Sequence, residues 1–99
     1  MQIKLTDDFL KSLKNFDKTV VSRIFLRFER IKQGNFGDFK NLGNGLSELR
    51  FSFGVRVYYS EIEKGVLILV LTAGTKNTKK EQSADIEKAL KILKRETEK

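Results

Sequence analysis

The spacing of hydrophobic residues changes from helical to strand-like across one segment rich in Gly and Asn, residues 34–45. Before this segment, apolar residues recur at intervals of three and four, which is typical of amphipathic helices. After it, apolar and polar residues alternate, which is typical of half-buried strands. The segment itself has no sustained period and is expected to form a loop. The chain is therefore expected to adopt an α+β fold.

Two amphipathic helices are expected before the loop, preceded by a short strand at residues 2–5. Thr6 is followed by Asp7 and Asp8 and has the features of a helix N-cap. Residues 15–18 should separate the helices, because Asn and Asp side chains bond to their own backbone in competition with the helix. A third helix should begin at Glu81, and the charged tail at residues 95–99 should fray.

Three strands are expected between the loop and the last helix. Residues 48–53 and 55–60 alternate apolar and polar side chains, and residues 66–71 form an unbroken aliphatic run suited to a central strand. Short connections favour an antiparallel sheet, against which the two N-terminal helices must bury their apolar stripes. With 99 residues, the chain has room for a single domain, residues 1–99.

The composition restricts the available chemistry. The chain contains neither Cys nor His, so any catalysis must use Lys, Arg, Tyr or carboxylates, and the commonest metal ligands are absent. No cofactor is expected. Twenty basic residues against thirteen acidic ones leave a net charge of +7, which favours a polyanionic partner, although Lys-rich helices can simply be solvated. No signal peptide or membrane-spanning run is recognisable, so a cytoplasmic protein is expected.

Four residues are candidates for a site that acts on RNA. The period of two places Arg50, Arg56 and Tyr58 on the polar side of two neighbouring strands, and Lys76 follows the end of the third. Cleavage by the 2′-hydroxyl needs a proton acceptor, positive charge at the scissile phosphate and an acid for the leaving oxygen. Arginines can supply the charge; Lys76 or Tyr58 can act as a base only if its pKa is lowered.

A purely structural interpretation of the same residues remains open at this point. Arg50 can pair with Glu48 on a solvated sheet face, while Tyr58 covers apolar surface.

Several motifs resemble those of one protein family. GNFGDFK (34–40) followed by GNGLSELR (43–50) resembles the signature of HigB-like addiction module killer proteins within the RelE superfamily. RVYY (56–59), LTAGTKNT (71–78) and DIEKA (85–89) resemble further segments of that family. The resemblance extends over most of the chain and is densest between residues 34 and 76.

The resemblance implies a RelE-like fold, with two N-terminal helices packed on a twisted antiparallel β-sheet and a C-terminal helix. Such proteins are toxins of type II toxin–antitoxin systems that cut translated mRNA on the ribosome without a metal or cofactor, inhibiting translation and arresting growth. Arg50 and Arg56 match basic strand residues that hold the substrate phosphate, and Lys76 matches a position assigned to phosphate or leaving-group chemistry. Tyr58 is included only for its shared face. Further RNA contacts are expected from Lys40, Lys79 and Lys80.

The implied partners are the ribosome, mRNA and a cognate antitoxin, usually a helix-turn-helix DNA-binding protein resembling HigA. The antitoxin is expected either to cover the face of Arg50, Arg56 and Lys76 or to displace the C-terminal helix.

This sequence also departs from the family pattern. The turn before Arg56 is shorter than in many relatives, Thr75 replaces the usual Asp, and the last helix begins without the aromatic or His of some members. Two other functions therefore remain open. ParE-like inhibitors of DNA gyrase share the fold, and a non-catalytic basic module could bind nucleic acid or a partner protein.

Overall fold

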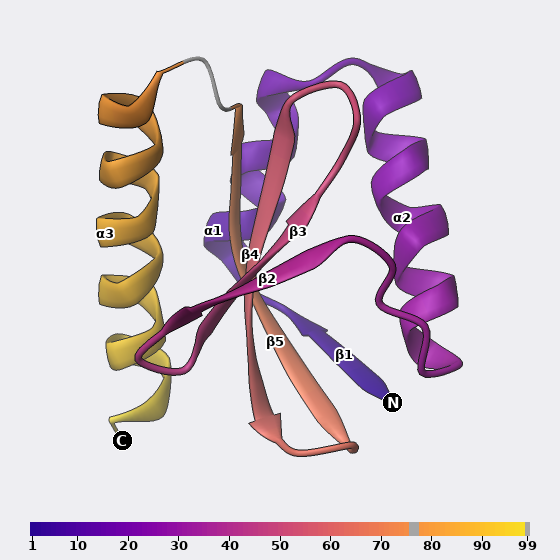
Figure 1. The fold of residues 1–99 in the computed structure, drawn as a ribbon, viewed down its shortest axis with the longest axis vertical. Coiled ribbons are helices and arrows are strands. Elements are labelled where there is room, and N and C mark those ends of the chain that lie inside the picture. Colours follow the sequence, from indigo (N-terminus) through magenta and orange to yellow (C-terminus); the bar gives the residue numbers. More distant parts are fainter. Residues whose placement is uncertain (76–77, 99) are drawn as a thin grey trace.

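The computed structural model describes residues 1–75 and 78–98, and Figure 1 shows their arrangement as a ribbon. In these residues a central sheet lies between two helical layers. The helices α1 and α2 occupy one side of the sheet, and α3 lies on the other (Figure 1). The elements follow in the order β1 (Gln2–Leu5), α1 (Asp7–Ser12), the 3-10 turn η1 (Leu13–Asn15), α2 (Lys18–Lys32), β2 (Phe39–Gly43), β3 (Leu46–Arg50), β4 (Val55–Glu63), β5 (Leu67–Thr75) and α3 (Lys79–Thr97).

The sheet has the strand order β1-β5-β4-β3-β2. Strands β3 to β5 form the expected antiparallel meander, which the unexpected strand β2 extends, whereas β1 runs parallel to β5 and forms one edge. The helices α1 and α2 carry the chain from β1 at one edge of the sheet to β2 at the other, and the meander then brings β5 back beside β1 in the parallel direction. The α+β fold, the early strand, the separation of the first two helices and the central position of β5 are therefore confirmed.

Several expected boundaries were wrong, among them the end of the strand expected at residues 48–53, which stops at Arg50. The segment 34–45 is not all loop, because Phe39–Gly43 forms edge strand β2; its mostly exposed side chains do not alternate apolar and polar, and its pairing with β3 comes from backbone groups. Strand β5 continues to Thr75, since its last residues still pair with β4. Helix α3 continues to Thr97 rather than fraying at Arg95, which forms an ion pair with Asp8 of α1.

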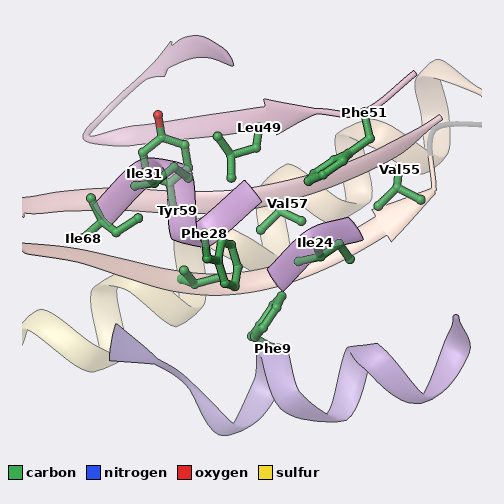
Figure 2. Packing of buried hydrophobic residues seen from close by; sticks show 11 residues of the cluster. Phe9, Ile24, Phe28, Ile31, Leu49, Phe51, Val55, Val57, Tyr59 and Ile68 are labelled. Carbon is green, nitrogen blue, oxygen red and sulfur yellow. The ribbon is translucent and has the colours of Figure 1, made fainter. Parts of the chain in front are cut away.

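The larger core fills the space between the sheet and the helices α1 and α2. Figure 2 shows the aromatic ring of Phe28 and the side chain of Ile24 facing the strands, with Phe9 of α1 beside them. The strands contribute Leu49, Val57, Tyr59, Ile68 and Val70. Each fully buried side chain of this size contributes about 1.5–3 kcal/mol, so this cluster is the main source of stability.

A smaller core joins the opposite side of the sheet to α3. Tyr58 and Leu71 of the sheet pack against Ala89 and Ile92 of this helix. Strand β5 supplies residues to both cores, which explains its uninterrupted aliphatic sequence.

Thr6 attaches the first helix to the sheet. Its hydroxyl accepts a hydrogen bond from the Phe9 amide at 3.1 Å and donates one to the Leu71 carbonyl at 2.7 Å. The expected N-cap is confirmed, and this buried side chain also fixes where α1 begins relative to β5. None of the helices in the described part of the chain is long and apolar enough to span a membrane.

Candidate functional site

The two strand arginines lie directly opposite each other. Arg50, the last residue of β3, pairs with Arg56 near the start of β4, and Arg56 in turn pairs with Gly74 of β5. Residues opposite each other in an antiparallel pair point to the same side of the sheet. Both arginines therefore lie on the side that carries α3, near the helix's N-terminal end.

A second row of residues on the same side runs beside the arginines. The strand pairing aligns Lys40, Glu48, Tyr58 and Thr72 across four strands. Lys40, on the edge strand, is exposed, whereas Glu48, Tyr58 and Thr72 are buried. The predicted RNA contact Lys40 thus lies on the same face as the arginines.

The side chain of Arg50 is held by two carboxylates. Its Nε lies 3.3 Å from Oε1 of Glu48, and Nη1 lies 3.8 Å from Oδ1 of Asp38. Glu48 is 1% exposed, and its second oxygen accepts a hydrogen bond from Gln82 of α3 at 3.3 Å. The pairing of Arg50 with Glu48 is present, but it is not a solvated surface pair: the carboxylate is buried and fixes the guanidinium.

Arg56 is only partly satisfied. Its Nη1 donates to the carbonyls of Val55 and Phe51 at 3.2 and 3.5 Å, while its buried Nε finds no acceptor among the described residues. An unpaired buried donor costs about 1–3 kcal/mol, so Arg56 is held in an energetically unfavourable environment.

Tyr58 does not lie on an open face. It is 1% exposed and belongs to the core under α3, so its ring covers apolar surface, as in the structural interpretation of the sequence. Burial, and then the charges of Asp85 and Glu48, raise the pKa of its hydroxyl. A hydroxyl that holds its proton so firmly is unsuited to act as a general base near neutral pH.

Asp85 of α3 closes the site over the end of β5. Its carboxylate lies against Gly74 so closely that a side chain at Gly74 would collide with it. Burial, above all, raises the pKa of Asp85, and the charge of Glu81 adds to this, while Lys88 opposes it. A groove of about 510 Å³ opens beside this carboxylate, between α1, the end of β5 and α3.

The remaining predicted site residues are three lysines, and for the two that it describes the structure shows no hydrogen bond to the arginine pair. Lys79 and Lys80 are exposed in the first turn of α3. Lys76 lies outside the described residues. Within residues 1–75 and 78–98, no group of three or more acidic side chains is arranged to hold a metal ion.

Glu48, Gln82 and Asp85 were not recognised as site residues from the sequence. Glu48 and Asp85 belong to the quoted motifs SELR and DIEKA. Alternation places Glu48 on the face of Arg50, but only the position of α3 shows that this carboxylate is buried and that Asp85 reaches the same region.

Comparison with known proteins supplies a family and a fold. Residues 11–94 match a family model described as phage-derived protein Gp49-like. A protein of Haemophilus influenzae described as uncharacterized is 40% identical over 101 residues, covering 97% of this chain and 95% of the relative.

Solved structures of toxins share the architecture. The isolated RelE toxin of E. coli has a TM-score of 0.64 at 17% identity, covering 87% of this chain and 95% of RelE. A RelE mutant in complex with a peptide of its antitoxin has a TM-score of 0.64 at 15% identity, covering 85% of this chain and 92% of that one. A copper-bound mutant toxin from Helicobacter pylori has a TM-score of 0.52 at 17% identity, covering 77% and 94%. At these identities the likeness establishes the RelE-like fold, as expected from the sequence.

Proposed function

The chain belongs to the family of phage-derived Gp49-like proteins, and from this premise we propose that it is the toxin of a type II toxin–antitoxin pair, a ribosome-dependent and metal-independent mRNA endoribonuclease. The observation that supports this most is the pair of opposed arginines, one held by a buried carboxylate and the other with an unsatisfied buried donor, in a RelE-like fold.

The proposed chemistry is attack of a 2′-hydroxyl on the adjacent phosphate. The new 2′-O–P bond forms as the bond from phosphorus to the 5′ oxygen breaks, leaving a cyclic phosphate and a 5′-hydroxyl. Arg50 and Arg56 bind the non-bridging oxygens, whose negative charge grows in the transition state. One group must take the 2′ proton and another must protonate the leaving oxygen.

Lys76 is proposed for one of these proton transfers, on the strength of the motif resemblance. Asp85 is a second candidate, because it lies over Gly74, opposite Arg56, and its pKa is raised. Tyr58 was selected because it lies on the same face of β4 as Arg56. Its hydroxyl is proposed only as a proton donor. Lys40, Lys79 and Lys80 are proposed to contact the RNA backbone around the site.

Dependence on the ribosome agrees with the composition. The chain has no His, so no side chain has an ordinary pKa near neutrality. A ribosome that orients the scissile nucleotide would offset weak acid–base catalysis by bringing the reacting atoms into line. Action on the ribosome also implies a cytoplasmic location.

The proposed partner is an antitoxin, resembling HigA, with an acidic surface. The net charge of +7 favours such a surface. In this proposal the antitoxin covers the arginine face or displaces α3, whose hydrogen bond from Gln82 to Glu48 ties it to the site. A complex that leaves both regions exposed would refute this part of the proposal.

The test is controlled expression in cells, followed by mapping of RNA 5′ ends. New ends within translated messages are expected soon after induction. The double substitution Arg56→Ala and Lys76→Ala should abolish them, whereas Lys91→Ala with Lys94→Ala, which removes the same charge from exposed positions of α3, should not.

Other results would select another function. Growth arrest with intact mRNA, SOS induction and stabilised gyrase cleavage complexes would indicate a ParE-like gyrase inhibitor. Salt-sensitive RNA binding without cleavage or toxicity would indicate a non-catalytic binding module.

A further inference from the structure

A second basic surface lies on the other side of the β3–β4 turn from the arginine pair. It is a groove of about 250 Å³ between α2 and this turn. Arg23, Arg27 and Arg30 are spaced to project from one side of α2, and Phe51 and Phe53 come from the turn. We call this surface the α2 groove; its lining residues are Arg23, Leu26, Arg27, Arg30, Phe51, Ser52 and Phe53.

The middle arginine of the α2 groove is structural. Arg27 donates hydrogen bonds to the carbonyls of Phe36, Asp38 and Arg50, at 3.0, 2.6 and 3.0 Å. Its guanidinium also lies 4.9 Å from the centre of the Phe51 ring. Arg27 therefore stabilises the end of β3. Because it binds the backbone carbonyl of Arg50, it lies between the α2 groove and the candidate site.

The two flanking arginines, Arg23 and Arg30, are not held by hydrogen bonds to backbone carbonyls among the described residues as Arg27 is. Arg23 and Arg30 are exposed, and neither lies within ion-pair distance of a carboxylate in the part of the chain that the structure describes. Burial lowers the pKa of Arg27, and although Asp38 opposes this, the charge of Arg30 lowers it further. Positive charges that repel one another in a groove favour an anionic occupant.

The α2 groove contains aromatic rings as well as positive charges. The guanidinium of Arg23 lies 5.4 Å from the centre of the Phe53 ring, which restrains its orientation, while Leu26 is 64% exposed in the same groove. Flat guanidinium groups and apolar surface beside unpaired charges suit single-stranded RNA, whose phosphates need cations and whose bases stack. Arg23 and Arg30 are separated by about 10 Å along the helix, enough for more than one nucleotide.

We propose that the α2 groove binds single-stranded RNA next to the nucleotide held at Arg50 and Arg56, with Arg23 and Arg30 on successive stretches of its backbone. The RNA passes over the β3–β4 turn, which separates the two surfaces. This inference rests on the proposed function, because it extends the path of the same RNA substrate.

The test compares RNA binding by the whole chain and by a charge-matched pair of variants. Fluorescence anisotropy with a short oligouridine probe, over a range of salt concentrations, measures affinity. Arg23→Ala with Arg30→Ala should weaken binding roughly tenfold and reduce the log–log salt slope by about 1.4, since single strands give about 0.7 per phosphate contact. Lys91→Ala with Lys94→Ala should change both quantities much less.

A conservative variant separates stacking from charge. Arg23→Lys should keep the salt slope but lose part of the affinity, because an ammonium group cannot stack as a guanidinium does. Thermal melting followed by circular dichroism should show that the variants are folded, since all four substituted positions are exposed.

Each other outcome contradicts a specific statement. If the two double variants lose RNA affinity equally, net charge alone explains the loss and the inference is overturned. Unchanged RNA affinity together with weakened antitoxin binding would make the α2 groove a protein-binding surface. If the wild type cuts mRNA and the Arg23/Arg30 variant binds and cuts equally well, the inference alone fails; if the wild type neither binds nor cuts RNA, the proposed function fails as well.

Discussion

Glu48 holds Arg50 from the same face of the sheet: the carboxylate is buried beneath α3, and its Oε1 accepts a hydrogen bond from Nε of Arg50, 3.3 Å away. Gln82 of α3 donates to the other oxygen, also at 3.3 Å. One buried side chain thus connects a phosphate-binding candidate to the C-terminal helix, so the arginine's position depends on where α3 lies.

Substitution Glu48→Gln should reduce mRNA cleavage roughly tenfold while leaving the chain folded. The amide keeps the shape of the side chain but loses the charge that orients Arg50, and charge-assisted hydrogen bonds are the stronger kind. Single-turnover cleavage in a reconstituted translation reaction would show the loss in the rate constant rather than in binding. An unchanged rate with native melting would mean that Arg50 does not depend on Glu48.

Substitution Tyr58→Phe should leave cleavage within about threefold of the wild type. The ring stays in the core under α3, and the hydroxyl, whose pKa is raised, cannot serve as a base at neutral pH. The same cleavage assay measures this. A hundredfold loss at native melting temperature would instead give the hydroxyl a role as a proton donor.

Substitution Asp85→Asn should stabilise the protein at neutral pH, by up to about 4 °C in Tm. A carboxyl group with a raised pKa binds its proton more tightly in the native than in the unfolded state. The contribution of Asp85 to wild-type stability therefore falls as the pH rises from about 4, the ordinary carboxyl value, through the raised pKa. The amide carries no charge, so its advantage should be complete above that pKa and vanish below about pH 4.

Melting curves for both proteins across this pH range would measure the difference. Glu87→Gln, an exposed charge removal on the same helix, is the matched control and should show no such dependence. Lower stability of Asp85→Asn at neutral pH would contradict the prediction. Reduced cleavage by the stabilised variant would support a functional role for this carboxylate.

Substitution Thr6→Ala should lower the unfolding free energy by about 2 kcal/mol, or Tm by about 10 °C. It removes the cap of α1 and leaves the Leu71 carbonyl without its hydroxyl donor. Chemical denaturation gives the free energy directly. Thr6→Ser keeps the hydroxyl and should retain most of the stability; equal losses in both variants would attribute the effect to the missing methyl group.

Local patterns were sufficient for much of this fold. The alternation of Val55, Val57 and Tyr59 with polar neighbours identified which side of β4 faces the larger core, because side-chain direction in a strand has a period of two. The same rule placed Arg50 and Arg56 on one face. Edge strand β2 was missed because its side chains are mostly exposed and show no such period.

The alternation of side chains could not predict which element covers each face of the sheet. Tyr58 and Glu48 were expected on an open polar surface, yet α3, which begins about twenty residues after Tyr58, buries both. The proximity of Asp85 to Gly74 and the arginine–aromatic contacts of the α2 groove likewise join residues distant in the chain.

The sequence by itself therefore determined the class of fold, the faces of the strands β3 and β4, and a set of candidate site residues that contains neither His nor Cys. It could do so because periodicity and composition are local properties of the chain. Only the tertiary structure decided that Glu48 fixes Arg50, that Tyr58 is core and that Asp85 closes the site. These depend on the packing of α3 against the sheet, which is set by contacts between distant residues and has no local signature.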